Sequence, residues 1–253
     1  MRFSIITVVN NNVDCIECCI KSVIAQSFAN LEYIIIDGGS TDGTLEVIDR
    51  YKENISRVVS EEDEGYVHAM NKGLKLATGG VIGFLHADDV YASANTINHV
   101  ATLLEKSHAD SIYGDLVYVG KRDTEKVVRY WKGGESDKHK FEWGWMPPHP
   151  TFFAKKIVYE KYGYFNTDFK IAADYEIMLR FLYKYGISTY YVPEVLVKMR
   201  SGGASNRSFR NIVIKSLEDY KACRIHGIKR KLYAIMLKNM TKLPQFFIGK
   251  GKI

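Results

Sequence analysis

The sequence predicts an α/β fold in which a mostly parallel central sheet is flanked by helices. Short apolar segments alternate with segments of helical periodicity along the first half of the chain. The apolar segments are continuous rather than alternating, which is typical of parallel strands buried on both faces. These predicted strands cover residues 3–9, 31–37, 55–60 and 81–86. The helical segments between them cover residues 14–26, 44–52 and 66–77.

Length and composition agree with one large domain of this class. The chain has 253 residues, of which 46% are apolar, enough for a full hydrophobic core. No leader peptide is recognisable, because Met1-Arg2 runs directly into the first predicted strand. No apolar run approaches the roughly 18 residues that a membrane span needs. We therefore expect a cytoplasmic protein.

The second half of the chain has a different organisation. Residues 109–120 and 126–133 predict a long hairpin, and an aromatic, proline-containing loop follows at residues 141–153. A helix is expected to begin near Asp174. The last predicted elements are one or two strands over residues 188–200 and a helical region over 208–241 with a break near Gly227.

Polar residues follow the predicted parallel strands at their carboxyl ends, where such sheets bind ligands. They are Asn10-Asn11, Asp37, Glu61-Glu62-Asp63 and Asp88-Asp89. Asp37 opens the turn DGGSTDGT, in which Ser40-Thr41-Asp42 are expected to cap the next helix. An acid at such a strand end suits a ribose or base, although a plain strand–turn–helix connection is an alternative. The glycine fingerprints of nicotinamide enzymes and P-loop proteins are absent, which argues against both classes.

The segment 81–91 ends a buried strand with two neighbouring carboxylates, Asp88 and Asp89. Like charges side by side repel each other, and removal of water strengthens the repulsion. A positive charge is therefore expected beside the pair. The alternative is a turn in which these residues cap the next helix.

Five segments together resemble the motifs of family 2 glycosyltransferases with the GT-A fold. They are SIITVVNN, IIIDGGSTDGT, EDEGYVHAMNKGL, GFLHADDVY and ADYEIMLRF, in the order and spacing expected of that family. The resemblance covers residues 1–205. It implies a Rossmann-like catalytic domain with a nucleotide-binding half over about 1–115 and an acceptor half over about 116–205. Residues 206–253 would then form a basic helical extension.

The resemblance implies an inverting transferase that uses a nucleotide-diphosphate sugar and a divalent cation, Mn²⁺ or Mg²⁺. Asp89 would ligate the metal and Asp88 would contact the donor, in an Ala87-Asp88-Asp89 form of the DxD element. Such a cation takes oxygen ligands and acts as a Lewis acid on the departing diphosphate. The loop 65–71 would border the base or ribose. The residues carried over to the nucleotide pocket are Thr7, Val9, Asn10, Asp37, Asp63 and Asn71.

Asp174 matches the family's general base, which takes the proton of the acceptor hydroxyl as that hydroxyl attacks the anomeric carbon. From the residues alone, a helix N-cap is an equal alternative for Asp174. Glu176, two residues further on, is expected to face solvent.

Four further residues are candidates on the acceptor and phosphate side. Trp143 and Trp145, in WGWMPPHP, would either stack on acceptor sugars or belong to the core. By the resemblance, His149 contacts the metal or a phosphate. Arg200, in the segment RSGGAS over residues 200–205, is expected to contact phosphate from a mobile loop, with a simple flexible turn as the alternative.

The charge is unevenly distributed. The formal net charge is +6, but after Asp219 the chain has nine basic residues and no acids, and the remainder is slightly acidic. A basic tail that also carries apolar residues favours an anionic membrane surface as a partner. The alternative is a helix that packs on the catalytic domain or on a partner subunit.

These features predict a glycosyltransferase of polysaccharide biosynthesis, with a UDP-sugar favoured as donor and a glycan or lipid-linked oligosaccharide as acceptor. We expect it in the cytoplasm, with peripheral contact to the inner face of the plasma membrane, and a homodimer is left open. One alternative, a sugar-1-phosphate nucleotidyltransferase, would need a Gly- and Arg-rich loop after the first strand. The other, an inactive nucleotide-sugar-binding scaffold, disagrees with the intact acids. A nucleic-acid partner is not expected, since only the tail is basic.

Overall fold

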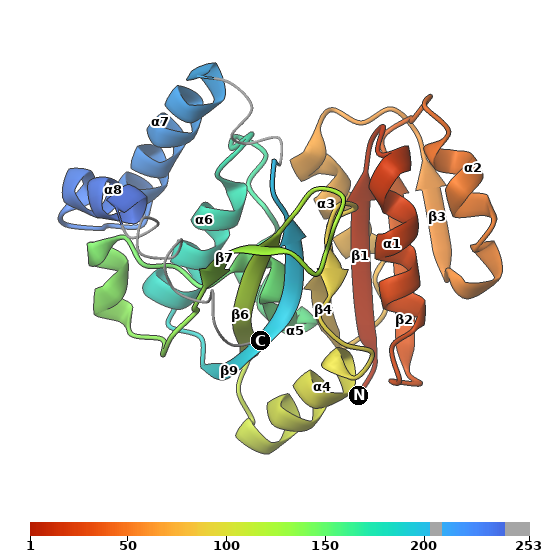
Figure 1. Cartoon of the computed structure of the whole chain (residues 1–253). Coiled ribbons are helices and arrows are strands. Elements are labelled where there is room, and N and C mark those ends of the chain that lie inside the picture. Colours follow the sequence, from red (N-terminus) through yellow and green to blue (C-terminus); the bar gives the residue numbers. More distant parts are fainter. Residues whose placement is uncertain (203–208, 241–253) are drawn as a thin grey trace.

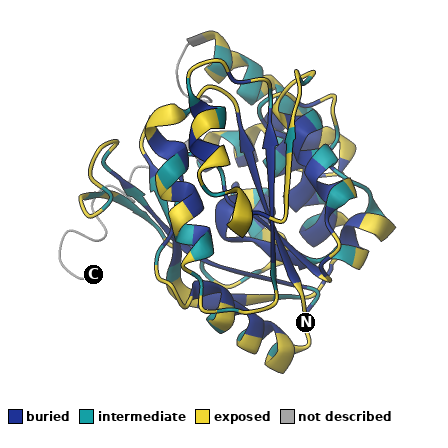
Figure 2. Ribbon diagram, turned by 90° about the vertical axis from the view of Figure 1, so that its right-hand side faces the viewer, coloured by how far each residue is buried: buried dark blue, intermediate teal, exposed yellow. Residues whose placement is uncertain are grey.

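The computed structural model describes residues 1–202 and 209–240, which form a central sheet with helices on both faces (Figure 1). Within these residues the sheet has nine strands in the order β3-β2-β1-β4-β8-β6-β9-β5, and β7 pairs with β6 outside this path. In Figure 2 the strands between the helix layers are buried, whereas the outward faces of the helices are exposed. The predicted α/β class is confirmed.

The parallel part of the sheet comes from the first strands of the chain. Its members are β1 (Phe3–Val9), β2 (Leu31–Asp37), β3 (Arg57–Ser60) and β4 (Val81–Phe84). β1 pairs with β2 and β4, and β2 pairs with β3. The register sets Val9 opposite Asp37 and Asp37 opposite Ser60. The polar residues predicted at the strand ends therefore gather at one edge of the sheet.

The remaining strands make the other part of the sheet mixed. They are β5 (Val90–Tyr91), β6 (Ser111–Val119), β7 (Val127–Trp131), β8 (Phe153–Lys155) and β9 (Thr189–Arg200). β6 and β7 form the predicted hairpin, and β6 also pairs with β9 in parallel. β8 is antiparallel to β4 and β6, and β5 is antiparallel to β9. The region predicted as one or two strands is the single strand β9.

Each face of the sheet has its own apolar core, because successive strand residues point to opposite faces. Ile5 of β1 lies in one core and Ile6 in the other. The Ile5 core is covered by α1 (Val13–Ile24), α2 (Thr44–Asp49) and α4 (Thr96–Ser107). The Ile6 core is covered by α3 (Tyr66–Leu76), α5 (Lys156–Tyr162) and α6 (Ala173–Met178). Short 3₁₀ and π segments complete the described elements: η1 (Lys52–Asn54), η2 (Lys138–Trp143), η3 (His149–Thr151) and the π-helix η4 (Leu179–Lys184).

The helices α7 (Phe209–Ile225) and α8 (Lys231–Met240) pack on the α6 side of the molecule (Figure 1). Their buried residues Ala222, Cys223, Ile228 and Ala234 belong to the Ile6 core. The Lys238 ammonium donates to the Asp219 carboxylate at 2.8 Å, and both side chains are buried. The alternative of packing on the catalytic domain therefore holds for residues 209–240, while the rest of the predicted basic tail lies outside the described residues. No helix in the described part of the chain has the length and apolarity needed to cross a bilayer.

Gly144 fixes how closely α8 approaches η2. Its φ is +78°, and a Cβ at this position would lie 2.3 Å from the carbonyl oxygen of Ala234 and 2.4 Å from the backbone nitrogen of Lys238. Gly144→Ala should therefore displace α8 and lower the free energy of unfolding by about 3 kcal/mol, measured by chemical denaturation.

Gly134 provides the matched control, since its φ is +69° and no neighbouring atom lies within 4 Å of the place that a Cβ would take. Gly134→Ala should cost only the conformational part, about 1 kcal/mol. Equal losses in the two variants would show that the contact with α8 does not constrain residue 144.

Candidate active site

The turn after β2 is built around the carboxylate of Asp37. Its Oδ2 accepts hydrogen bonds from the backbone N–H groups of Gly39 (3.1 Å) and Ser40 (3.0 Å) and from the Ser60 hydroxyl (2.7 Å). Its Oδ1 accepts from the Ser40 hydroxyl at 2.5 Å. Asp37 is fully buried, so the structure gives it a role in shaping the turn. Its direct contact with a nucleotide stays a prediction.

A second carboxylate, that of Asp42, binds the loop after β1 to the loop after β2. It accepts from the backbone N–H groups of Val13 and Thr44, each at 3.0 Å, and so holds the first residues of both α1 and α2. The N–H of Asn12 donates to the Thr44 hydroxyl at 2.9 Å. The N-cap of α2 is Gly43, so the cap predicted over residues 40–42 is wrong by position, although Asp42 does hold the helix start.

Three residues predicted in the nucleotide pocket belong to β1 or follow it. Thr7 is fully buried within the strand, and its hydroxyl donates to the Leu85 carbonyl at 2.8 Å. These contacts give Thr7 a packing role and lend no support to ligand contact. Val9 is buried at the strand end, whereas Asn10 is exposed and donates to the Gly38 carbonyl at 2.6 Å. Of the three, Asn10 is the accessible one.

Asp63 and Asn71, which are predicted to contact the base or ribose, differ in whether a side-chain atom is left without a hydrogen-bond partner. One oxygen of Asp63 accepts from Lys72 at 2.5 Å, and the other is buried without a hydrogen-bond partner among the described residues. Lys72 also pairs with Glu61 at 2.6 Å. Asn71 instead exchanges two hydrogen bonds with the backbone of Phe165, at 2.8 and 2.9 Å. Asp63 thus has one buried oxygen without a partner among the described residues, while both ends of the Asn71 amide tie α3 to the chain before α6.

The carboxylate of Asp89 is buried. It is 1% exposed, and neither oxygen has a hydrogen-bond partner in the described part of the chain. Burial, and then the charge of Asp88, raise the pKa of Asp89 well above its usual range, while Arg200 acts in the opposite direction. Arg200 is itself buried and donates to the carbonyls of Asp88 (2.8 Å) and Lys121 (3.2 Å). A buried carboxylate beside a half-buried one is stabilised by a bound cation.

Two stacked histidines lie beside these carboxylates. The ring centroids of His86 and His149 are 6.1 Å apart with planes at 22°, and the Tyr66 hydroxyl lies 2.8 Å from His86 Nε2. Burial lowers the pKa of His149 to about 4, against the charge of Asp174. Burial likewise lowers the pKa of His86, against the charges of Asp88 and Asp174. His149 is therefore neutral at physiological pH, which is the form that ligates metals.

The charge of Asp174 acts on the same side chains as the charges of the Asp88-Asp89 pair. Its charge and that of Asp88 both oppose the fall in the pKa of His86. The pKa of Tyr118 is raised by burial, with Asp89 and Asp174 acting in the same direction and Arg129 against them. The charge of Asp174 thus acts on the same side chains as those of Asp88 and Asp89, which it follows by about 85 residues in the sequence.

The start of α6 corrects two expectations. Its N-cap is Ala172, and Asp174 lies in the first turn, where its carboxylate accepts from the next backbone N–H at 2.7 Å. The N-cap alternative for Asp174 is therefore wrong. Glu176 was expected to face solvent, but it is 3% exposed, accepts from Arg180 at 3.0 Å and lies 2.8 Å from His226 Nε2.

The two tryptophans have different environments. Trp145 is half-buried, packs edge-to-face on Phe141 and donates its Nε1–H to the Gly133 carbonyl at 2.7 Å, so the core alternative fits it. Trp143 is 50% exposed and packs edge-to-face on Tyr233 of α8. Trp143 is therefore the one that is accessible for stacking on a sugar.

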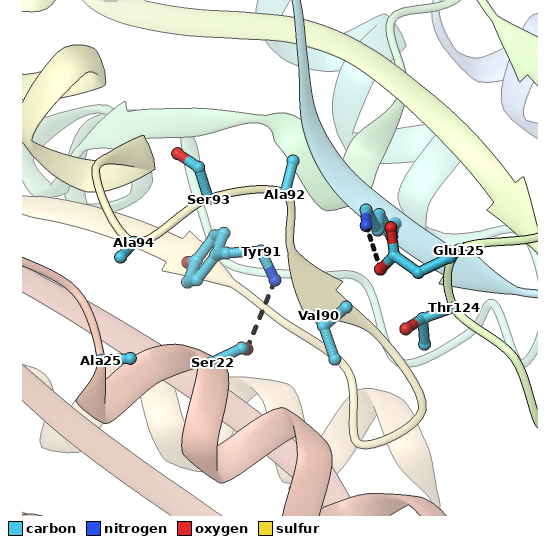
Figure 3. Close-up of a pocket in the computed structure, with 10 residues that line it drawn as sticks. Ser22, Ala25, Val90, Tyr91, Ala92, Ser93, Ala94, Thr124 and Glu125 are labelled. Atoms are coloured by element: carbon cyan, nitrogen blue, oxygen red, sulfur yellow. Dashed lines mark hydrogen bonds and ion pairs between the residues drawn. The ribbon is translucent and has the colours of Figure 1, made fainter. Parts of the chain in front are cut away.

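A basic cavity of about 330 Å³ adjoins Arg200. It is lined by Lys121, Arg122 and Arg200 together with Asp14, Cys15 and Cys18 of α1. A second cavity, of about 280 Å³, lies between α1, β5 and the β6–β7 loop (Figure 3). There Lys198 pairs with Glu125 at 2.6 Å, and the Tyr91 N–H donates to the Ser22 hydroxyl. The second cavity contains none of the predicted site residues.

The protein by itself supplies few ligands for a metal. Within the described residues, no group of three or more His, Cys, Asp or Glu side chains is placed to hold an ion. The unpartnered oxygens of Asp89 still fit a hard cation. Mg²⁺-type ions are commonly held by one or two carboxylates plus substrate phosphates, so this donor set fits a cation that binds together with a diphosphate.

Comparison with known proteins identifies the family of this chain. The sequence model described as "Glycosyl transferase family 2" matches residues 4–170. The chain belongs to glycosyltransferase family 2. A PGL/p-HBAD biosynthesis glycosyltransferase from Mycobacterium tuberculosis is 28% identical over 209 residues, which cover 81% of this chain and 79% of the relative. An uncharacterized glycosyltransferase from the same species is 31% identical over 183 residues, covering 70% of this chain and 67% of the relative.

Solved structures extend the likeness to the whole fold of this glycosyltransferase. S. aureus TarS, residues 1–349, aligns with a TM-score of 0.69 and 18% identity over 100% of this chain and 76% of that one. The mannosyltransferase PcManGT from Pyrobaculum calidifontis, in complex with GDP-Man and Mn²⁺, aligns with a TM-score of 0.67 and 19% identity over 97% and 73%. The predicted GT-A fold is thereby confirmed.

Sequence reasoning did not single out His86, and it included Tyr66 only within the segment 65–71 that was expected to border the base or ribose. His86 stands two positions before Asp88, within the segment already singled out, so its place at a buried strand end was the available signal. Tyr66 opens α3 after Gly65, and only the fold brings its hydroxyl to His86.

The unpartnered carboxylate of Asp89 leads to a prediction about stability without metal. In the presence of a chelator, Asp89→Asn should raise the melting temperature by about 2–4 °C, which corresponds to about 1 kcal/mol, because it removes a buried charge beside Asp88. The raised pKa of Asp89 means that the folded state holds this proton more tightly than the unfolded state. Wild-type stability should therefore fall as pH rises above about 4, and the variant should lose this part of the fall.

Thermal unfolding across pH in EDTA measures both effects. Asp49→Asn is the control, because the Asp49 side chain is 72% exposed. An Asp89→Asn variant that melts below the wild type in EDTA would show that the described protein already stabilises this charge.

Proposed function

We propose that this family 2 glycosyltransferase is a metal-dependent, inverting enzyme that moves a sugar from a nucleotide-diphosphate sugar to an acceptor hydroxyl. The observation that carries the proposal is the buried Asp89 beside Asp88, whose oxygens have no hydrogen-bond partner among the described residues, with the charge of Asp174 acting on the same neighbouring side chains. We further propose that residues 1–205 form the catalytic domain, with its nucleotide-binding half up to about residue 115. Residues 206–253 would form the basic extension.

The nucleotide would lie along the carboxyl edge of the parallel strands. Asn10 is accessible there, and Asp63 keeps an unpartnered oxygen for a ribose or base. The basic cavity beside Arg200 offers Lys121 and Arg122 to a diphosphate. Structures of TarS with UDP or UDP-GlcNAc and of PcManGT with GDP-Man support a nucleotide sugar as donor. We favour a UDP-sugar.

Asp89 would hold the cation, with Asp88 towards the donor and neutral His149 nearby. When bound, Mn²⁺ or Mg²⁺ would supply positive charge that offsets the carboxylates and the leaving diphosphate. The Mn²⁺ in the PcManGT complex supports this assignment. Among the described residues, Arg200 supplies positive charge beside this pair. Its guanidinium donates to two backbone carbonyls, which hold it there.

Asp174 would act as the general base. An inverting transfer requires a carboxylate that removes the acceptor proton as the hydroxyl attacks the face opposite the leaving diphosphate. Asp174 is not the N-cap of α6, and only one of its oxygens is used, on the Tyr175 N–H, so the other is available for this role. The alternative enzyme, a sugar-1-phosphate nucleotidyltransferase, is disfavoured because the loop after β1 carries neither its Gly nor its Arg residues. An inactive scaffold is disfavoured by the retained acids.

The acceptor would be a glycan or a lipid-linked oligosaccharide of polysaccharide biosynthesis. Exposed Trp143 offers an aromatic face near α8 for a sugar ring. The 28%-identical mycobacterial relative is named for PGL/p-HBAD biosynthesis, which supports a biosynthetic rather than a degradative role.

Contact with an anionic membrane at the cytoplasmic face would bring such an acceptor within reach. α8 exposes Leu232, Met236 and Met240, which are four residues apart and so share one face of the helix. The basic run 229–231 stands immediately before this face. Apolar residues flanked by cations are typical of helices that lie on anionic membranes.

Asp174→Asn tests the proposed function most directly. The release of nucleoside diphosphate from the bound UDP- or GDP-sugar should fall by about 10²–10⁴-fold, because a neutral amide is too weak a base. Donor affinity and melting temperature should stay near the wild-type values, since the Asn side-chain oxygen can still accept the Tyr175 N–H. Asp174→Ala should also lower the free energy of unfolding by about 1 kcal/mol, because it removes the acceptor of the Tyr175 N–H and a negative charge in the first turn of α6. The measurement is steady-state turnover in Mn²⁺ or Mg²⁺, with calorimetry for donor binding.

Near-normal turnover of Asp174→Asn would remove Asp174 as the base. Full wild-type activity in excess chelator would instead remove the cation from the proposal. The two outcomes are independent, because each concerns a different side of the site.

The membrane contact gives a separate prediction. Leu232→Ser/Met236→Ser should weaken co-sedimentation with phosphatidylserine vesicles at least tenfold, because two exposed apolar side chains no longer enter the bilayer. Donor affinity should not change. Ile157→Ser on α5 is the matched control, since Ile157 is 58% exposed on a different helix. If the wild-type protein does not co-sediment with these vesicles even at low salt, the proposed contact is contradicted.

A further inference from the structure

α7 contacts the backbone that leads into α6 through a single carboxylate. Oε1 of Glu218 accepts the N–H of Lys170 at 2.9 Å, and Oε2 accepts the N–H groups of Ile171 and Ala172 at 2.8 Å each. Hydrogen bonds to an ionised acceptor are stronger than those between neutral groups. Three consecutive residues are therefore held in one conformation immediately before the helix that carries Asp174.

A second contact holds α6 just after Asp174. Glu176 accepts from Arg180 at 3.0 Å and lies 2.8 Å from Nε2 of His226, which directly follows α7. The three side chains are largely buried. The α7 region thus contacts this short helix on both sides of Asp174: at Ala172, two residues before it, and at Glu176, two residues after it.

α6 has little support of its own at this point. It spans only Ala173–Met178, it has no side-chain hydrogen bond at its N-cap, and a π-helical segment follows it directly. A short helix of this kind is marginal in isolation, so tertiary contacts decide where its first turn lies. The direction of the Asp174 carboxylate therefore depends on the contacts made by α7.

We propose that Glu218 is a positioning residue for the general base: it fixes residues 170–172 so that Asp174 points at the acceptor hydroxyl. The proposal rests on the role of Asp174 given under the proposed function. Loss of the carboxylate would let the first turn of α6 shift, and a misplacement of about 1 Å costs roughly 10²-fold in rate. The donor side of the site lies at the strand ends, so donor affinity should not depend on Glu218.

The test uses the full chain with Glu218→Gln and Glu218→Ala. In the Gln variant one carbonyl oxygen and one NH₂ group replace two acceptor oxygens, so at least one of the three backbone donors loses its partner. We expect kcat for nucleoside diphosphate release to fall about 10–100-fold, with the donor Kd within about twofold of the wild type. Hydrogen exchange of the peptide covering residues 168–176 should become faster. If the Ala variant does not fold, the Gln variant carries the test alone.

Asp168→Asn is the matched control. Asp168 lies in the same loop and pairs with Lys221 of α7 at 3.3 Å, but its side chain is 71% exposed. Its loss should leave kcat and the exchange of residues 168–176 unchanged. A fall in kcat in this control equal to that in Glu218→Gln would overturn a specific role for Glu218.

A double-mutant cycle with Asp174→Asn separates positioning from general stabilisation. If Glu218 acts through Asp174, the double variant Asp174→Asn/Glu218→Gln should turn over within about twofold of Asp174→Asn alone. Losses that multiply would overturn the positioning role while leaving Asp174 as the base. Wild-type turnover in Asp174→Asn would instead refute the base assignment itself, and this inference with it.

Discussion

The burial of Asp89, whose carboxylate has no hydrogen-bond partner within residues 1–202 and 209–240, is the constraint around which this site is arranged. β4 lies in the middle of the sheet, between β1 and β8, so the residues that follow it enter protein rather than solvent. A charge there is unfavourable, and Asp88 makes it more so. Arg200 lies beside the pair and donates to two backbone carbonyls that hold it in place. Two histidines also lie there, and burial lowers the pKa of each. A buried charge that lowers the stability of the fold in this way is typical of a binding site.

Hydrogen bonding divides the acids at this edge into two kinds. Asp37 and Asp42 use their oxygens on backbone N–H groups and hydroxyls, and so build the loops on which a ligand would rest. Asp63 and Asp89 keep buried oxygens without partners among the described residues. Because unpaired buried oxygens are costly, they indicate where a ligand or cation completes the structure. The distinction separates scaffold from site among residues of identical chemistry.

The sequence was sufficient for features that depend on local pattern. Continuous apolar runs located β1 to β4, and the acids after them located the edge at which Asp88 and Asp89 lie. It failed where long-range contacts decide: Glu176 is buried because His226 and Arg180 reach it, and the N-cap of α6 is Ala172 rather than Asp174. Motif position alone likewise could not show that the Thr7 hydroxyl bonds inside the sheet. No local signal distinguishes a side chain that turns inward from one that faces a ligand.

α8 buries a lysine and exposes a leucine, which is the opposite of the burial that hydrophobicity favours. Lys238 is buried against Asp219 and the ring of Tyr175, while Leu232 on the same helix is 76% exposed. Two fixed contacts explain this orientation: the ion pair with α7, and the close approach of Gly144 to the α8 backbone. Because these two contacts set the rotation of the helix about its axis, its exposed side carries Leu232, Met236 and Met240. An apolar face imposed by buried polar contacts, next to the basic run 229–231, is suited to a surface that is apolar and anionic, which is why we connect it with a lipid-borne acceptor.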